Sequence, residues 1–346
     1  MIVVEEDGVL LFLDILEGAL ASNRSPSDEE VDRILSTGFM AFMIEAYSRL
    51  LDLTRSDVAS FLKNLGSEKP ISTDPVKSMF EEGFRSCYDL SRIAELRRNV
   101  EQISGIDFQG AEGMALSYLP PGTDIRSTLY LTVDAFNPGM VFGGNMGRSI
   151  LHPVRYPLDL SYLAHEFHHL GFGCWVSRSP DLERAFLGEE THESVAVRLV
   201  LHMISEGMAN HFCTPNMVRP GPDRSPRVNE KIRRYGRDLR HMLEEAVDLL
   251  SDCVAKEAPV DRCEERLMDI VLDREKMLPK VHFMGAEIIG LLDEDPCVEL
   301  SEIVDLCRRP ERFLALYSGV AEKEGFPAVP EGVAELLIDI IRGLRA

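Results

Sequence analysis

The sequence predicts a predominantly α-helical α+β fold with one small antiparallel sheet. Most segments carry apolar residues at the helical spacing of i, i+3 and i+4. Residues 127–133 are instead rich in β-branched and aromatic residues, and residues 140–143 follow an Asn137-Pro138-Gly139 turn. A chain of 346 residues, 45% of them hydrophobic, can bury a full core.

Residues 1–110 form a predicted N-terminal helical region. Apolar residues recur at helical spacing over 8–20, and residues 25–30, Ser-Pro-Ser-Asp-Glu-Glu, have the pattern of a capped helix start. Further helices are expected at 38–51, 56–65, 74–84 and 90–103. This region carries no chemical motif, so we expect it to pack against the rest of the chain and to shape the site.

Residues 111–346 form the predicted catalytic region. It begins with a sheet of three or four strands at 114–154, whose edge is either a plain hairpin or a surface that pairs with an extended peptide. Two helices that carry the candidate site follow, at 159–172 and 190–211. The expected C-terminal helices cover 231–255, 261–278, 278–292, 310–317 and 333–344.

The first of these two helices contains the motif His165-Glu166-x-x-His169. On a helix the two imidazoles lie about 40° apart, with the Glu166 carboxylate on the same side. Such a pair can bind zinc, and Glu166 is then placed to take a proton from a water at the metal. Gly171 or Gly173 is the expected end of this helix. His168 points to the other side, so we interpret it as a structural or orienting residue.

Zinc needs a third protein ligand, and Glu206 is the candidate. It lies in a segment that is apolar nearly all round, as in a buried helix. A buried carboxylate must be paired, protonated or bound to a metal. The alternative to the metal is a salt bridge to Arg198. His202 and Asn210, one turn before and after Glu206, share its face and could orient the ligands.

A third helix begins near His282, which is a candidate for polarising the scissile carbonyl or stabilising the oxyanion. Tyr162 is a second candidate for that role, and a purely structural histidine is the plain alternative. Gly285, one turn later, indicates close approach to another helix. The loop at 214–229, rich in proline, glycine and arginine, is long enough to act as a lid or an ordered cover.

Composition narrows the classes of partner. The net charge of −21 disfavours nucleic acids and anionic membranes, because their phosphates would be repelled. No apolar stretch approaches the length of a transmembrane helix, and the first residues do not have the pattern of a secretory signal. The seven cysteines are scattered without a CxxC pair. A cytoplasmic location is therefore expected.

The motifs around His165, Glu206 and His282, in this order, resemble those of the gluzincin branch of zinc metallopeptidases. The quoted residues are His165-Glu166-Phe-His-His169-Leu-Gly-Phe, Ser205-Glu206-Gly207-Met-Ala209-Asn210 and His282-Phe-Met-Gly285. More narrowly, the chain resembles an uncharacterised group of zinc-dependent peptidases known as a domain of unknown function. That group has a helical N-terminal part and a Glu-Gly-x-Ala motif. The resemblance implies a zincin-like metallopeptidase core and one zinc ion.

The sequence thus predicts a zinc metallopeptidase that acts on a peptide or protein substrate. His165, His169 and Glu206 would bind Zn2+, with Glu166 as general base and His282 stabilising the oxyanion. Where that group is expected to carry a tyrosine, this chain has His282, which leaves the oxyanion stabiliser open between His282 and a tyrosine. Two alternatives remain: a zinc hydrolase of non-peptide amides or esters, and a catalytically silent zinc protein. The oligomeric state is open.

Overall fold

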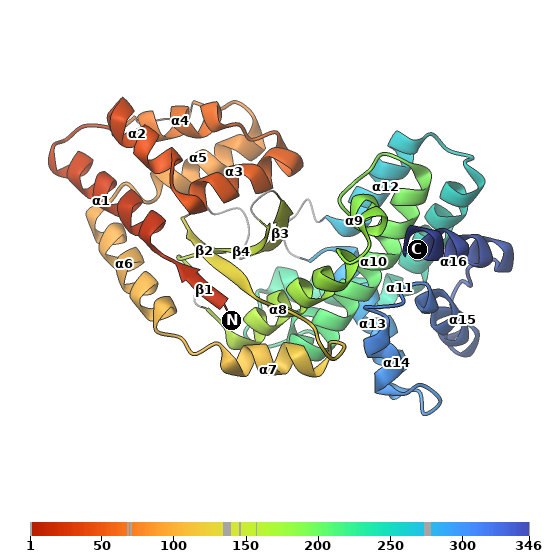
Figure 1. Ribbon diagram of the computed structural model, residues 1–346. Coiled ribbons are helices and arrows are strands. Elements are labelled where there is room, and N and C mark those ends of the chain that lie inside the picture. The colour runs from red at the N-terminus through yellow and green to blue at the C-terminus, as the bar shows by residue number, and fades with distance from the viewer. Residues whose placement is uncertain are drawn as a thin grey trace. The chain divides into compact units, whose positions relative to one another are not determined.

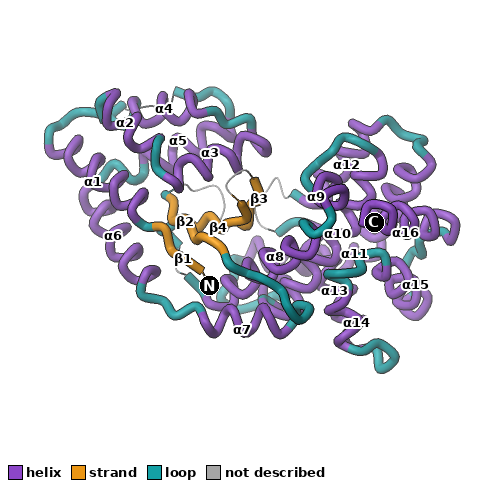
Figure 2. The backbone as a smooth tube through the Cα atoms, viewed as in Figure 1, coloured by secondary structure: helices purple, strands orange, loops and turns teal. Residues whose placement is uncertain are grey.

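The computed structural model describes residues 2–67, 69, 71–133, 140–144, 147–156, 158–272 and 278–345. Helices dominate, and four strands form one sheet within these residues (Figures 1 and 2). The chain divides into two units. One comprises Met1–Gln109 and Arg126–Asp159, and the other comprises Gly110–Ile125 and Leu160–Ala346. The predicted division into regions 1–110 and 111–346 stays a prediction, while the sheet belongs to the same unit as the N-terminal helices.

The first unit surrounds an aromatic core. The rings of Phe12 and Phe39 meet edge to face at 6.3 Å, and Phe84 lies 6.0 Å from Phe12. The Ser27 hydroxyl and the Glu30 carboxylate form the predicted capping box, which satisfies backbone N–H groups at the start of a helix. The helices are α1 (Asp7–Ala21), α2 (Asp28–Leu35), α3 (Gly38–Leu51), α4 (Arg55–Lys63), α5 (Pro75–Arg85) and α6 (Leu90–Ser104).

The sheet is mixed, so the prediction of an antiparallel sheet was wrong. Its order is β1 (Ile2–Glu5), β2 (Ser127–Thr132), β4 (Gly147–Pro153) and β3 (Met140–Gly144). The β1–β2 and β2–β4 pairs are parallel, and only β3–β4 is antiparallel. The N-terminal strand was not predicted, because parallel pairing with a strand far along the chain leaves no turn signal. The predicted 137–139 turn lies outside the described residues.

The second unit holds the helices of the candidate site. It starts with most of α7 (Gln109–Ser117), which occupies residues where the sheet was expected to begin. The elements that follow are α8 (Leu160–Val176), α9 (Pro180–Phe186), α10 (His192–Met208), the π-helix η1 (Ala209–Cys213), the short helix η2 (Pro215–Val218), α11 (Pro226–Ala255), α12 (Val260–Val271), α13 (Lys280–Glu294), α14 (Leu300–Asp305), α15 (Arg312–Glu324) and α16 (Glu331–Arg345).

Helix α8 does not end at Gly171 or Gly173 as predicted, but continues to Val176. Gly171 is needed for packing: a Cβ there would lie 2.3 Å from the Leu119 side chain. The glycine therefore lets the segment after α7 pack directly on α8, and it does not act as a cap.

Helices α10 and α13 cross with their backbones in contact, as Gly285 predicted. A Cβ on Gly207 would lie 2.6 Å from the Gly285 carbonyl oxygen, and one on Gly285 would lie 2.6 Å from the Met203 carbonyl oxygen. No side chain fits between backbones this close. The crossing places the residue before Gly207 beside the first turn of α13. Among the described residues, no helix combines the length and the apolar character needed to span a bilayer.

Candidate metal centre

Helix α8 presents His165 and His169 one turn apart, and their Nε2 atoms lie 2.9 Å from each other. The opposite nitrogen of each ring is held by a hydroxyl. His165 Nδ1 lies 3.0 Å from Thr214 Oγ1, and His169 Nδ1 lies 2.8 Å from Ser205 Oγ. If each Nδ1–H donates to its hydroxyl oxygen, each Nε2 is left with a lone pair for a cation.

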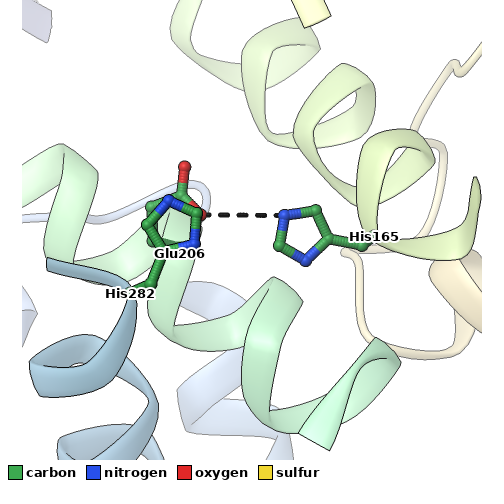
Figure 3. Close-up of side chains that lie close together, drawn as sticks. All are labelled: His165, Glu206 and His282. Carbon is green, nitrogen blue, oxygen red and sulfur yellow. Dashed lines mark ion pairs between the residues drawn. The ribbon is translucent and has the colours of Figure 1, made fainter. Parts of the chain in front are cut away.

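Helix α10 places the Glu206 carboxylate beside both of these nitrogens. Its Oε2 lies 3.7 Å from His165 Nε2 and 3.4 Å from His169 Nε2 (Figure 3 shows the first pair). The alternative partner, Arg198, forms an ion pair with Glu264. The predicted triad of two imidazoles and one carboxylate is thus assembled at one point.

His282, in the first turn of α13, completes a cluster of four donors. Its Nδ1 lies 3.2 Å from Glu206 Oε2, and its ring is nearly parallel to that of His165, with centroids 6.2 Å apart (Figure 3). Donor atoms of His165, Glu206 and His282 all lie within 4.8 Å of one another. His169 belongs to the same cluster, because its Nε2 lies 2.9 Å from His165 Nε2 and 3.4 Å from Glu206 Oε2. His165 and Glu206 could therefore hold a cation together with either His169 or His282.

A π-helical turn follows Glu206 and supplies two orienting groups. The Asn210 amide Nδ2 lies 2.8 Å from the Glu206 carbonyl oxygen, 3.3 Å from Glu206 Oε2 and 3.1 Å from His282 Nδ1. The Thr214 N–H donates to the Ala209 carbonyl oxygen and closes the turn. A π turn holds one more residue than an α turn, and such turns recur at functional sites. Asn210 lies on the predicted face, whereas Ser205 and Thr214 were missed because an isolated hydroxyl forms no motif.

Glu166, the predicted general base, is buried, with 4% of its surface exposed, beside His165 on α8. Its negative charge is among the influences that raise the pKa of His169. The Tyr162 ring lies parallel to that of His165 with centroids 6.1 Å apart, so the second candidate for the oxyanion also borders the cluster.

Two further histidines, His168 and His202, lie near the cluster and contact other groups. His168 Nε2 lies 3.2 Å from the Tyr118 carbonyl oxygen, and burial lowers the pKa of this imidazole to about 3. His202 packs on the Phe186 ring, with centroids 5.2 Å apart, and burial lowers its pKa to about 4. Both rings are therefore neutral near pH 7, as residues within a helical core should be.

The charges of the cluster suit a cation. Burial and the neighbouring His169 hold the pKa of His165 well below its ordinary value, so this imidazole is neutral. Burial opposes ionisation of Glu206, but His282 and His169 outweigh it and hold the carboxyl pKa well below its usual range. For His169, burial is likewise outweighed, here by Glu206, and its pKa is raised. Two imidazoles and one ionised carboxylate form the donor set of catalytic zinc sites.

Comparison with known proteins yields one family. A family model described as "Putative zinc dependent peptidase (DUF5700)" matches residues 41–325, which is most of the chain. No curated protein matches the chain. No solved structure matches it either.

Proposed function

The chain belongs to the family whose model matches residues 41–325, and from this premise we propose that it is a zinc-dependent peptidase of the gluzincin type. His165, His169 and Glu206 would hold the ion. The convergence of these three side chains from α8 and α10 is the single observation that carries the proposal. When bound, zinc would polarise the peptide carbonyl and make a water acidic enough to lose its proton near neutral pH.

The protein's own residues would handle the protons. Glu166 takes the proton of the attacking water and later gives it to the leaving amine. Its place on α8, next to His165 and buried inside the site, supports this role. His282 faces the cluster from α13 and would donate a hydrogen bond to the carbonyl oxygen as negative charge develops there. Asn210 would hold the His282 ring in place.

Metal content and peptide hydrolysis, measured on the same preparations, test the proposal. Wild-type protein should bind one zinc ion per chain and cleave peptides. The Glu206→Ala variant should lose most of its zinc affinity, because the cluster then keeps only neutral imidazoles and no carboxylate. The Glu166→Gln variant should keep its zinc and lose hydrolysis by at least about a thousandfold, because the amide cannot accept a proton. Full activity in Glu166→Gln would refute the general base, and unchanged zinc in Glu206→Ala would refute the ligand set.

One observation favours a second candidate, a zinc protein without turnover. His282 lies as close to Glu206 as the α8 imidazoles do, and zinc sites with four protein ligands are structural. This reading predicts that His282→Ala weakens zinc binding about as strongly as His169→Ala does. The peptidase reading predicts that His282→Ala keeps the zinc and loses activity. Peptide, amide and ester substrates in the assay would also identify a hydrolase of another bond.

A further inference from the structure

A cavity in the second unit lies away from the candidate metal centre. It has a volume of about 360 Å³ and is bordered by the end of α8, the start of α9, the residues after α14 and the end of α16. Trp175, on its wall, follows His165 by ten residues on one helix, which corresponds to roughly 15 Å along the axis. The cavity therefore has no part in the candidate metal centre.

Arginine dominates the wall of this cavity. Four of its lining residues are arginines, and Asp305 is the one carboxylate among them; the arginines are Arg178, Arg308, Arg309 and Arg345. The whole chain carries 58 acidic and 37 basic residues, so a cationic cavity is unusual in it. Four guanidinium groups around one space repel each other unless negative charge compensates them.

Two of the arginines have such compensation. Arg345 Nη1 lies 2.9 Å from both carboxylate oxygens of Glu311. Arg309 Nε lies 3.7 Å from Asp305 Oδ2, a carboxylate that also faces Arg312. These ion pairs hold Arg345 and Arg309 in place. Asp305, the carboxylate in the cavity wall, is already shared by Arg309 and Arg312.

Arg178 and Arg308 lack a carboxylate partner among the described residues. Their guanidinium carbons lie 3.5 Å and 4.3 Å from the centre of the Trp175 ring. Each donates one hydrogen bond to a carbonyl: Arg178 to Gly122 at 3.4 Å, and Arg308 to Pro121 at 2.7 Å. The Arg308 Nε is buried and has no partner among the described residues. A guanidinium has five N–H donors, so most remain available.

We propose that this cavity binds an oxyanion, a carboxylate or a phosphate group, between Arg178 and Arg308. The planar donor fork of arginine matches both kinds of group, and stacking on the indole holds the forks in position before a ligand arrives. An anion there offsets the repulsion and satisfies the spare donors. Packing on the indole explains neither why both arginines lack a carboxylate partner nor why a cavity lies beside them.

Trp175 makes the proposal directly measurable, because it is the sole tryptophan of the chain. The full-length protein is titrated with inorganic phosphate, with a short acetylated peptide acid and with the same peptide as its amide, while sodium chloride keeps the ionic strength constant. Tryptophan fluorescence should change saturably with phosphate, with the peptide acid or with both, but not with the amide. A response to phosphate alone assigns a phosphorylated ligand, and a response to the peptide acid alone assigns a carboxylate.

Variants then locate the site. Arg178→Gln and Arg308→Gln should each weaken the apparent affinity at least about tenfold. Arg240→Gln, an exposed arginine on α11, should leave it unchanged. Because Arg178 is exposed, its variant should fold even if Arg308→Gln does not. No saturable response to either oxyanion would overturn the proposal, as would a response that both cavity variants retain. Removal of zinc should not alter the titration, so the result is independent of the proposed peptidase activity.

Discussion

At the scale of single residues, the geometry of the candidate metal centre depends on side chains outside the set of candidate ligands. Ser205 and Thr214 each hold one imidazole by its Nδ1, and Asn210 contacts both Glu206 and His282. Fixing the orientation of a ligand beforehand lowers the entropy lost on binding. The burial of Asn210 reflects this role, because none of its surface is exposed.

Replacing Asn210 should therefore weaken metal binding without unfolding α10. We expect Asn210→Ala to lower zinc affinity by about ten- to a hundredfold. Competition with a chromophoric chelator measures this change. Asn229→Ala is the matched control, because that amide bonds to Gly221 in the loop before α11, at 2.9 and 2.8 Å, and these bonds involve no candidate ligand. Equal affinities for the two variants would remove Asn210 from the centre.

At the scale of elements, the crossing of α10 and α13 sets the distance between Glu206 and His282. The two glycines at the crossing permit backbone contact, so both side chains project from the same point. Any added atom there must push the helices apart, because the obstacle is backbone and cannot rotate away.

A matched pair of glycine substitutions tests this geometry. Gly207→Ala should lower the free energy of unfolding by about 1–3 kcal/mol or more through overpacking. Gly319→Ala, on an exposed face of α15 with no atom near the new Cβ, should raise it by up to about 1 kcal/mol through helix propensity. Urea denaturation of both variants gives the values. A Gly207→Ala variant as stable as Gly319→Ala would contradict the crossing.

The elements also show what local sequence can and cannot predict. The helix at 38–51 and the capped start at Ser27 were predicted from spacing and capping residues, which act within a few positions. The close contact of Gly285 with α10 could be predicted, because a glycine inside a helix often marks a place where another backbone approaches. Strand β1 depends on parallel pairing with β2, whose residues lie more than a hundred positions along the chain. Gly171 was misread as a cap, because packing on Leu119 has no local signal.

Some residues of the candidate site could likewise be predicted from local sequence, and others could not. The nearness of His165, His169 and Glu206 could be predicted, because two histidines one helical turn apart and a carboxylate in an apolar helix form a recognisable pattern. Thr214 was not predicted, because it reaches His165 through a π turn that no residue pattern announces. The contact of Ser205 with His169 was missed because it forms only when α8 and α10 pack together.

At the scale of the whole molecule, buried neutral imidazoles make stability depend on pH. The pKa of His202 is about 4 in the folded protein, because burial disfavours its charged form, against 6.5 for an ordinary histidine. Between these values the unfolded chain binds a proton that the folded protein does not. The contribution of His202 to stability is therefore complete above pH 6.5 and falls as the pH drops toward 4, by up to about 1.4 kcal/mol per pH unit.

The His202→Gln variant should remove this contribution. Urea unfolding of metal-free protein from pH 7 to pH 4.5 should show a shallower loss of stability in the variant than in the wild type. His241→Gln changes a histidine that is exposed on α11 and should keep the wild-type slope. Identical slopes for all three proteins would mean that His202 is accessible to protons in the folded state.

The second unit is built from two separated pieces of chain, and this affects how it can be made. Leu119 fills the notch at Gly171, the Tyr118 carbonyl oxygen accepts from His168, and Thr123 accepts from the Trp175 indole. A fragment starting at Leu160 would carry all four candidate donors yet lack these supports. During synthesis, residues 110–125 emerge first, and the residues of α8 that they contact follow 50 to 52 positions later. A fragment that begins at Leu160 should therefore be less stable than the second unit of the intact chain, which contains both pieces.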